Sequence, residues 1–296
     1  MPAGGPRLLF KGGTSLSKAF GLISRFSEDI DITVFREDLD QPVEPADLVG
    51  LSGKKRKAAL EAIRDACQAY IAGPFTLKMH ELAAKALPQG GFKLGPDPDD
   101  KDGQTVLFWY PTVTATTSDY IRAAVKIEAG AKSALDPLIA ATVTPYVAQD
   151  LPDLDLNVGN VTTVKPKRTF WDKIMILHGL RQWYEKRGVL RHGGQRVSRH
   201  YYDIYRLAQA QDIAAWQADK GLAEDCATHA RLFFGSPDLG LDTATAGSFT
   251  LSPSDEMHAA LARDYAAMSG MIFGQIPSLE AILAEVAGLE QILNRK

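Results

Sequence analysis

The 296-residue sequence contains only two cysteines, has no long uninterrupted apolar run and carries no excess of basic residues. Cys67 and Cys226 lie far apart, and neither has a partner at the spacing of a metal site. We therefore expect both side chains to be buried as small apolar groups, not to form a disulfide or to bind a metal.

The lack of a long apolar run argues against a membrane-spanning helix. The N-terminal residues MPAGGPRLLF lack the charged and then apolar pattern of a signal peptide, so the sequence predicts a cytoplasmic protein without a membrane partner. A formal net charge of -3 excludes a globally basic nucleic-acid-binding protein, but it allows a local basic surface.

What is present is the composition of a globular protein, with 45% hydrophobic and 23% charged residues, in a chain long enough for two domains. Before residue 160, strand-like alternation of apolar residues surrounds a helical stretch. Beyond it, helical patterns follow one another, most of them separated by Gly and Pro. The sequence therefore predicts an α+β domain over residues 1–160 and a helical domain over residues 161–296.

Within these domains the patterns predict individual elements. The expected strands are 7–10, 29–35, 104–111, 120–130 and 144–151, with a loop over 90–103. The expected helices are 14–20, 52–87 with an interruption at Gly73-Pro74, 168–186, 198–211, 213–234, 255–271 and 278–294.

The most informative stretch runs from Leu8 to Phe35, where a Gly12-Gly13 turn precedes the alternating segment DIDITVF. Asp29 and Asp31 are two positions apart on the predicted strand, so they project from one face about 6.5 Å apart. Because two carboxylates there repel each other, a divalent cation such as Mg²⁺ or Mn²⁺ is their simplest partner. A glycine turn that leads into a helix exposes N–H groups that bind phosphate. Together these features predict a metal-bound nucleoside triphosphate (NTP).

Each feature also has a plainer interpretation. A Gly-Gly pair before a helix is usually only a turn, and Asp-x-Asp on a solvated strand face is often only polar surface. The spacing of the two favours the functional interpretation. Ser15 or Ser17 can add a hydroxyl, and Arg25 is expected either to contact phosphate or to pair with Glu28.

The segment FKGGTSLSKAFGLISRFSEDIDITVF closely resembles the signature of the AbiEii/AbiGii toxin family. These proteins are nucleotidyltransferases of type IV toxin–antitoxin and phage-defence systems, in the DNA polymerase β-like nucleotidyltransferase superfamily. The resemblance implies a mixed-sheet domain followed by a helical domain. It also implies transfer of a nucleoside monophosphate from an NTP to a hydroxyl, with release of pyrophosphate, by a toxin that a separately encoded antitoxin protein holds in check.

Carried over residue by residue, the resemblance implies phosphate binding by Gly12, Gly13 and Ser15. It implies that Asp29 and Asp31 are catalytic metal ligands.

A later strand offers a third carboxylate, which the superfamily often has. Glu128 in VKIEAG is the candidate metal ligand. Lys126 lies on the same face of this strand, so an ion pair between the two without a catalytic role remains the alternative.

The segments TFWDKIMILHGL and RHYYDIYRL resemble later motifs of the family, which implies that Lys173 and Asp203 are catalytic and complete the nucleotide pocket. Lys173 emerges from a largely apolar helix face, where a lysine either reaches water or points into a cleft. Asp203 either orients Lys173 or contacts the nucleotide, or it only forms surface ion pairs with Arg199 and Arg206.

The acceptor is suggested by residues 181–206, which concentrate arginines, histidines and tyrosines. Such a stretch suits an RNA end, with phosphates on the arginines and bases stacked on the rings. It can equally be a solvated connection between two helices. The resemblance to family members that modify tRNA makes the 3′ end of tRNA the expected acceptor.

Three hypotheses remain open on the sequence alone. The first is an RNA-directed nucleotidyltransferase toxin, the second is the same chemistry on a protein or small-molecule hydroxyl, and the third is an inactive nucleotide- or partner-binding module. Family members usually have a helical segment before the strand that contains Leu8, so we also expect weaker packing around this strand.

Overall fold

The structure is a computed structural model that describes residues 4–27, 29–87, 90–111 and 124–295. The chain forms two compact units. The sheet unit consists of the residues up to Ser15 together with Ser27–Val164, and the helical unit consists of Leu16–Phe26 together with Lys165–Lys296. The change of unit after Val164 lies four residues beyond the domain boundary that the sequence predicts at residue 160. The sequence analysis places residues 16–26 with the N-terminal domain, whereas here they belong to the helical unit.

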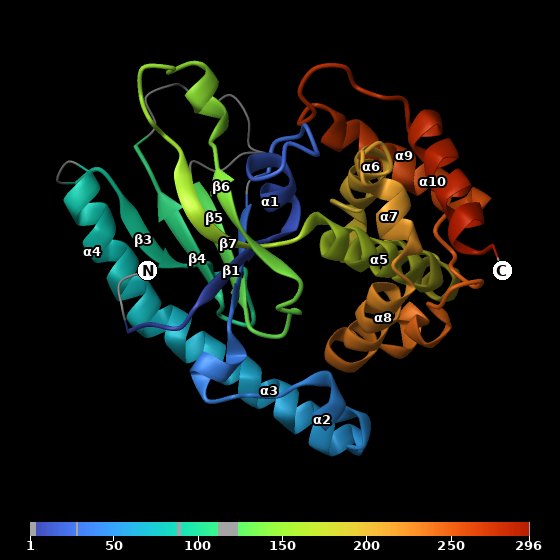
Figure 1. Ribbon diagram of the computed structural model, residues 1–296, viewed down its shortest axis with the longest axis horizontal. Coiled ribbons are helices and arrows are strands. Elements are labelled where there is room, and N and C mark those ends of the chain that lie inside the picture. Colours follow the sequence, from blue (N-terminus) through green and yellow to red (C-terminus); the bar gives the residue numbers. More distant parts are fainter. Residues whose placement is uncertain (1–3, 28, 88–89, 112–123, 296) are drawn as a thin grey trace. The chain divides into compact units, whose positions relative to one another are not determined.

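The sheet unit contains a seven-stranded mixed sheet with the order β3-β4-β5-β2-β1-β7-β6 (Figure 1). Its strands are β1 (Leu8–Lys11), β2 (Asp29–Val34), β3 (Lys93–Pro96), β4 (Thr105–Trp109), β5 (Ala124–Gly130), β6 (Leu138–Val143) and β7 (Val158–Val164). The β2–β5 and β1–β7 pairs are parallel, and the other pairs are antiparallel. The prediction of an α+β fold with a mixed sheet is thus confirmed, and β2 lies at its centre.

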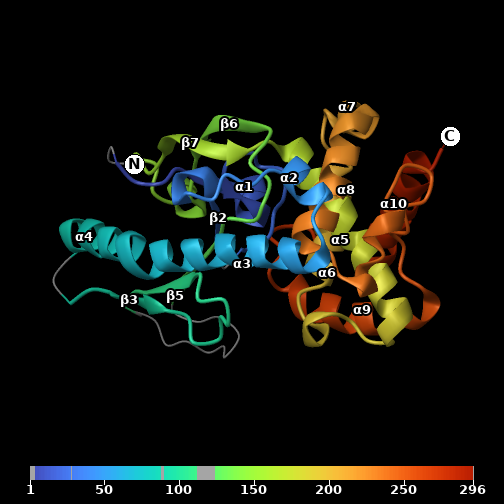
Figure 2. The same cartoon turned by 90° about the horizontal axis from the view of Figure 1, so that it is seen from below.

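A long helical run packs along the sheet (Figure 2). Its parts are α3 (Gly53–Tyr70), the π-helical turn η2 (Ile71–Phe75) and α4 (Thr76–Ala86), preceded by the short helix α2 (Pro45–Val49). α3 contacts β5, η2 contacts β4, and α4 contacts β3. The interruption expected at Gly73-Pro74 is therefore the π-helical turn, which fits because proline has no N–H to donate within a helix.

Three strand assignments differ from the sequence prediction. Residues 144–151 are not a strand but contain a short 3₁₀ helix, η3 (Tyr146–Gln149), while β6 and β7 on either side of them are real strands. The sequence of β7 includes Gly159 and Asn160, which are typical of turns and hide its strand pattern. The expected loop 90–103 contains β3.

The helical unit is formed by six main helices around one apolar core. They are α5 (Pro166–Arg187), α6 (Ser198–Leu207), α7 (Ile213–Ala218), α8 (Lys220–Phe234), α9 (Asp255–Ser269) and α10 (Leu279–Leu293). The helix expected over 213–234 is split at Asp219, whose carboxylate accepts a hydrogen bond from the Leu222 N–H and caps α8. Cys226 is buried in this core and Cys67 is buried in the sheet unit, and both are free thiols as predicted.

The segment 16–26 is anchored in the helical unit by apolar and main-chain contacts. Leu16 and Ile23 are fully buried in its core. The Phe26 N–H donates to the Met271 carbonyl at 2.7 Å, and residues 24–26 lie antiparallel to residues 271–273. The helix α1 (Gly12–Lys18) therefore begins in the sheet unit and ends in the helical unit.

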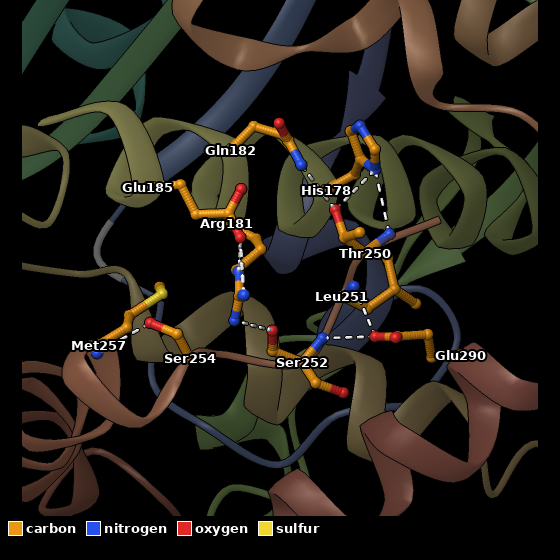
Figure 3. A network of polar contacts seen from close by, with 10 residues as sticks. All are labelled: His178, Arg181, Gln182, Glu185, Thr250, Leu251, Ser252, Ser254, Met257 and Glu290. Atoms are coloured by element: carbon orange, nitrogen blue, oxygen red, sulfur yellow. Dashed lines mark hydrogen bonds and ion pairs between the residues drawn. The ribbon is translucent and has the colours of Figure 1, made fainter. Parts of the chain in front are cut away.

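A polar network fixes residues 249–254 against α5 (Figure 3). His178 Nδ1 accepts a hydrogen bond from the Thr250 N–H, and Nε2 donates to the Gly240 carbonyl. The Glu290 carboxylate accepts hydrogen bonds from the N–H groups of Leu251 and Ser252, each at 2.7 Å. The side chains thus supply the hydrogen bonds that this irregular backbone lacks.

Across the part of the chain that the structure describes, no helix is both long and apolar enough to span a membrane.

Candidate functional site

The two aspartates lie on the central strand β2. Asp29 is buried and Asp31 is half-buried. In the parallel β2–β5 pair, Asp29 is opposite Lys126 and Asp31 is opposite Glu128, so the four side chains share one face of the sheet. The structure thus brings Asp31 and the candidate third carboxylate together, as the alternation in both strands predicts.

Gly12 lies directly against Asp31. Its φ is +74°, and a Cβ added there would overlap the Asp31 carboxylate, with Cγ at 2.7 Å. Both the left-handed backbone and the close approach therefore require glycine at this position. The first turn of α1 places its N–H groups, the predicted phosphate donors, beside the acidic face.

The hydroxyls of α1 serve structural roles in this structure. Ser15 is fully buried, and its Oγ donates to the Gly12 carbonyl at 2.9 Å. Phosphate binding by the Ser15 hydroxyl stays a prediction. Thr14, which the sequence analysis does not single out, has its Oγ1 2.7 Å from Ser27 Oγ and donates to the Asp29 carbonyl. It therefore ties α1 to the start of β2 and fixes the position of Asp29.

Glu128 is engaged in an ion pair. Lys126 Nζ lies 2.5 Å from Glu128 Oε1 and 3.7 Å from Asp97 Oδ2. Burial alone would lower the pKa of Lys126, but the Glu128 carboxylate outweighs it and raises this pKa, so the ammonium stays charged. The alternative interpretation of the VKIEAG segment, a Lys126–Glu128 pair, is therefore present, and metal binding by Glu128 stays a prediction.

The acidic face is suited to a divalent cation of the Mg²⁺ type. Over the described residues, no three His, Cys, Asp or Glu side chains are grouped closely enough to form a metal cage. Mg²⁺ usually needs only one or two carboxylates, because waters and substrate phosphates complete its octahedron. The oxygen donors of Asp29 and Asp31, beside the glycine turn, fit this requirement.

The other two predicted residues meet in the helical unit. Lys173 Nζ lies 2.7 Å from Asp203 Oδ2 and 3.4 Å from His200 Nδ1. Arg25 binds the same carboxylate in a bidentate manner, at 2.7 Å from Nε to Oδ1 and 2.8 Å from Nη2 to Oδ2. The side chains of Arg25, Lys173 and Asp203 are 5%, 7% and 0% exposed, so this is a buried cluster of two cations on one carboxylate.

The protonation states in this cluster follow from burial and neighbouring charge. Burial would raise the pKa of Asp203, but the Arg25 and Lys173 charges hold it below its usual range. Burial lowers the pKa of Lys173, which Asp203 opposes. Burial and the Lys173 charge lower the pKa of His200 well below its usual value, so its ring is neutral.

The cluster bears on the alternatives considered for Asp203 and Arg25. Among the described residues, the ion pairs of Asp203 are with Lys173 and Arg25 and not with Arg199 or Arg206, and its role in orienting Lys173 stays a prediction. Arg25 pairs with Asp203, while Glu28, the partner that the sequence suggests for it, lies outside the described residues. The partner of Arg25 is 178 positions away, so no local pattern could indicate it.

The basic segment 181–206 is largely used within the helical unit. Arg181 contacts Glu185 and the Ser252 carbonyl (Figure 3), and Arg187 pairs with Asp238. The rings of Tyr201 and Tyr202 are 0% and 1% exposed, so these two tyrosines do not offer a stacking surface for bases. The half-buried Trp183 lies beneath the guanidinium of Arg191, at 5.5 Å from the ring centroid, which is a cation–π geometry.

Two comparisons bear on the identity of the chain, while no curated protein matches it. In a search of solved structures, it is similar to MenT4, a nucleotidyltransferase toxin from Mycobacterium tuberculosis H37Rv, with 17% sequence identity and a TM-score of 0.52. The match covers 99% of this chain and 77% of that chain. At this identity the likeness concerns the fold, which is that of a nucleotidyltransferase toxin.

The family comparison is more specific. The model of the nucleotidyltransferase AbiEii toxin family of type IV toxin–antitoxin systems matches residues 2–292. It thus includes the glycine turn, the acidic pair on β2 and the buried cluster of the helical unit. Because the match spans nearly the whole sequence, this chain belongs to the AbiEii family of nucleotidyltransferase toxins.

Proposed function

We propose that the protein transfers a nucleoside monophosphate from an NTP to the 3′ end of tRNA in a reaction that depends on Mg²⁺ or Mn²⁺. The observation that supports this most directly is the contact between Asp31 and Gly12, because it joins an acidic strand face to a turn that can bind phosphate. The family supplies the NTP substrate and the antitoxin partner, while the acceptor and the metal belong to the proposal.

On the acidic face, Asp29 and Asp31 would hold the cation. The chemistry that such a cation supplies when bound is activation of the attacking hydroxyl and neutralisation of charge on the α-phosphate and pyrophosphate. The role of the chain is to fix the two carboxylates: the main chain of β2 holds their spacing, Gly12 sets the position of Asp31, and Thr14 sets that of Asp29. The N–H groups of Gly12 and Gly13 would bind phosphate oxygens.

In the helical unit, we propose that Lys173 supplies positive charge to the triphosphate. One carboxylate shared by two cations does not neutralise both. In this proposal Asp203 holds Lys173 in place. Because Arg25 binds the same carboxylate, Asp203 neutralises only part of the charge of Lys173. This arrangement favours an anionic ligand for Lys173.

For the acceptor, we propose that Arg191, Arg196 and the ring of Trp183 contact RNA. Arg191 is half-buried over the Trp183 ring, which presents a cation and an aromatic surface together. If RNA binding uses this surface, Arg191→Gln and Arg196→Gln should weaken it and flatten its dependence on salt. Arg64→Gln is the matched control, since Arg64 lies in the sheet unit and pairs with Asp65. An unchanged salt slope in the two variants excludes this surface.

The test of the reaction is a labelling assay. Purified protein is incubated with Mg²⁺, each α-labelled NTP in turn, and total tRNA. Label on RNA supports the proposal, and label on the protein or on a small molecule supports the second hypothesis. NTP binding without any label supports an inactive module. EDTA should abolish labelling if the reaction needs a divalent cation.

With NTP and tRNA as the proposed substrates, we propose a cytoplasmic location and a cellular role in phage defence.

A further inference from the structure

Lys126 lies beside Glu128, the side chain that would complete a three-carboxylate metal site with Asp29 and Asp31. Because β2 and β5 are parallel and in register, Asp29 neighbours Lys126 and Asp31 neighbours Glu128 on one face. A lysine ammonium thus stands among the same carboxylates that would share two divalent cations. Its Nζ is 2.5 Å from Glu128 Oε1, which is close contact for a charge-assisted hydrogen bond.

A second carboxylate holds Lys126 in this position. Asp97 follows directly after β3, and its side chain is only 3% exposed. Its Oδ1 accepts a hydrogen bond from the Asp99 N–H, and its own N–H donates to the Thr105 carbonyl. Its Oδ2 lies 3.7 Å from Lys126 Nζ. The ammonium is therefore held between a fixed buried carboxylate and Glu128.

The charges on this face agree with a single divalent cation. The carboxylates are those of Asp29, Asp31, Asp97 and Glu128, and the ammonium groups are those of Lys126 and of Lys11, which is opposite Asp31 in the β1–β2 pair. Among these described residues the carboxylates exceed the ammonium groups by two, which is the charge that one divalent ion neutralises. A second divalent ion would meet the Lys126 ammonium at short range and in a partly desolvated place.

We propose that Lys126 takes the place of a second divalent cation: it neutralises Glu128 and keeps it out of the metal coordination, so that the protein binds one divalent ion through Asp29 and Asp31. This inference rests on the proposed metal-dependent function. It also revises the third-carboxylate role that the resemblance implies for Glu128, which becomes the partner of Lys126. In this role Lys126 is a positioning residue that sets how many metal ions bind.

The experiment counts metal ions directly. Mn²⁺ is titrated into the full-length protein without nucleotide, and free Mn²⁺ is followed by its electron paramagnetic resonance signal. The wild type is expected to bind one Mn²⁺, and Lys126→Met is expected to bind two, because the repulsion between Glu128 and Asp31 then favours a second ion. The double variant Lys126→Met with Glu128→Gln is expected to return to one.

Lys126→Arg is the matched control and should still bind one ion, since it keeps the charge. Two ions in the wild type, or only one in Lys126→Met, would overturn the proposal. If Lys126→Met does not fold, Glu128→Gln decides, because it keeps the lysine. It should change Mn²⁺ affinity by less than about twofold, whereas loss of a true ligand should weaken affinity by about tenfold or more.

Asp31→Asn separates this inference from the proposed function. If Asp31→Asn does not weaken Mn²⁺ binding, the proposed metal site fails, and the role of Lys126 fails with it. If Asp31→Asn removes the ion but Lys126→Met does not add a second one, only the role of Lys126 is refuted.

Discussion

The two units treat buried charge in different ways. In the helical unit, the Asp203 carboxylate is fully buried and is bonded by two cations of the same chain, Arg25 and Lys173. In the sheet unit, Asp29 and Asp31 lie on one face with Glu128, and acidic groups outnumber lysines there. The buried carboxylate of the helical unit therefore has partners within the chain, whereas the proposed function gives the sheet face a divalent cation and phosphates as partners. Charge removal should cost stability as well as activity in the helical unit, but only activity on the sheet face.

The largest expected effect is the loss of activity in Asp31→Asn. Removal of this carboxylate should lower labelling by about 10³-fold or more, because the charge that binds the cation is lost. The free energy of unfolding should stay the same or rise slightly, because repulsion between like charges is relieved. Asp40→Asn is the control: Asp40 is exposed, has a φ of +57° that Asn tolerates, and should keep full activity. Full activity in Asp31→Asn would refute the metal assignment.

The opposite signature is expected for Asp203→Ala in the helical unit. This change leaves Arg25 and Lys173 buried without their carboxylate, so it should lower the free energy of unfolding by about 3–5 kcal/mol. Urea titration followed by circular dichroism measures the loss. Asp238→Ala, which breaks the largely exposed pair with Arg187, should cost less than about 1 kcal/mol. Equal effects of the two changes would contradict the view that the buried cluster is structural.

A backbone effect of intermediate size is expected at Gly12. Gly12→Ala combines a positive φ with overlap on the Asp31 carboxylate, whereas Gly21 has a φ of +62° and open space around its Cβ position. Gly21→Ala should therefore lower the free energy of unfolding by only about 1 kcal/mol, which is the cost of a positive φ in alanine. Gly12→Ala should lower the free energy of unfolding by more than this, and it should also lower labelling, because the Asp31 side chain must move. If both variants have equal stability and full activity, the contact between Gly12 and Asp31 has no functional importance.

The smallest effect expected is a dependence of stability on pH through His178. Burial lowers the pKa of this histidine, and both ring nitrogens are engaged by Thr250 and Gly240. As pH falls below the unfolded value of about 6.5, the unfolded chain takes up a proton that the folded chain refuses. Stability should then fall with decreasing pH by up to about 1.4 kcal/mol per pH unit, and be constant above that value. His178→Gln should reduce the slope between pH 5 and pH 6.5 in urea titrations, while the contribution of His200, whose pKa burial also lowers, remains. An unchanged slope would exclude His178 as one of its sources.

The sequence indicates the central strand and the helices well because their apolar periodicity is strong. The alternation predicts that Asp29 and Asp31 share one face of β2 and that Lys126 and Glu128 share one face of β5, while the register that sets Asp31 opposite Glu128 is known only from the structure. The edge strand β6 and its neighbour β7 are missed, since β6 shows little alternation and β7 includes the turn formers Gly159 and Asn160. Edge strands with one partner are less constrained by burial, so their pattern is weaker.

Long-range ion pairs are harder to predict than elements. Asp203 is flanked by Arg199 and Arg206 at helical spacing, and yet its partners are Lys173 and Arg25. The tyrosines of the basic segment show the same limit, because burial of Tyr201 in the core depends on helices far away in the sequence. Local spacing identifies possible partners for a charged side chain, but tertiary packing determines which of them form ion pairs.

The placement of residues 16–26 has a consequence for any attempt to divide the protein. The chain passes from one unit to the other three times, after Ser15, after Phe26 and after Val164. A fragment that begins after Val164 would lack Arg25, leaving Asp203 with Lys173 alone, and would have a gap where Leu16 and Ile23 belong. Neither half can therefore be made as a simple truncation. An isolated helical half would need residues 16–26 grafted back or supplied as a peptide.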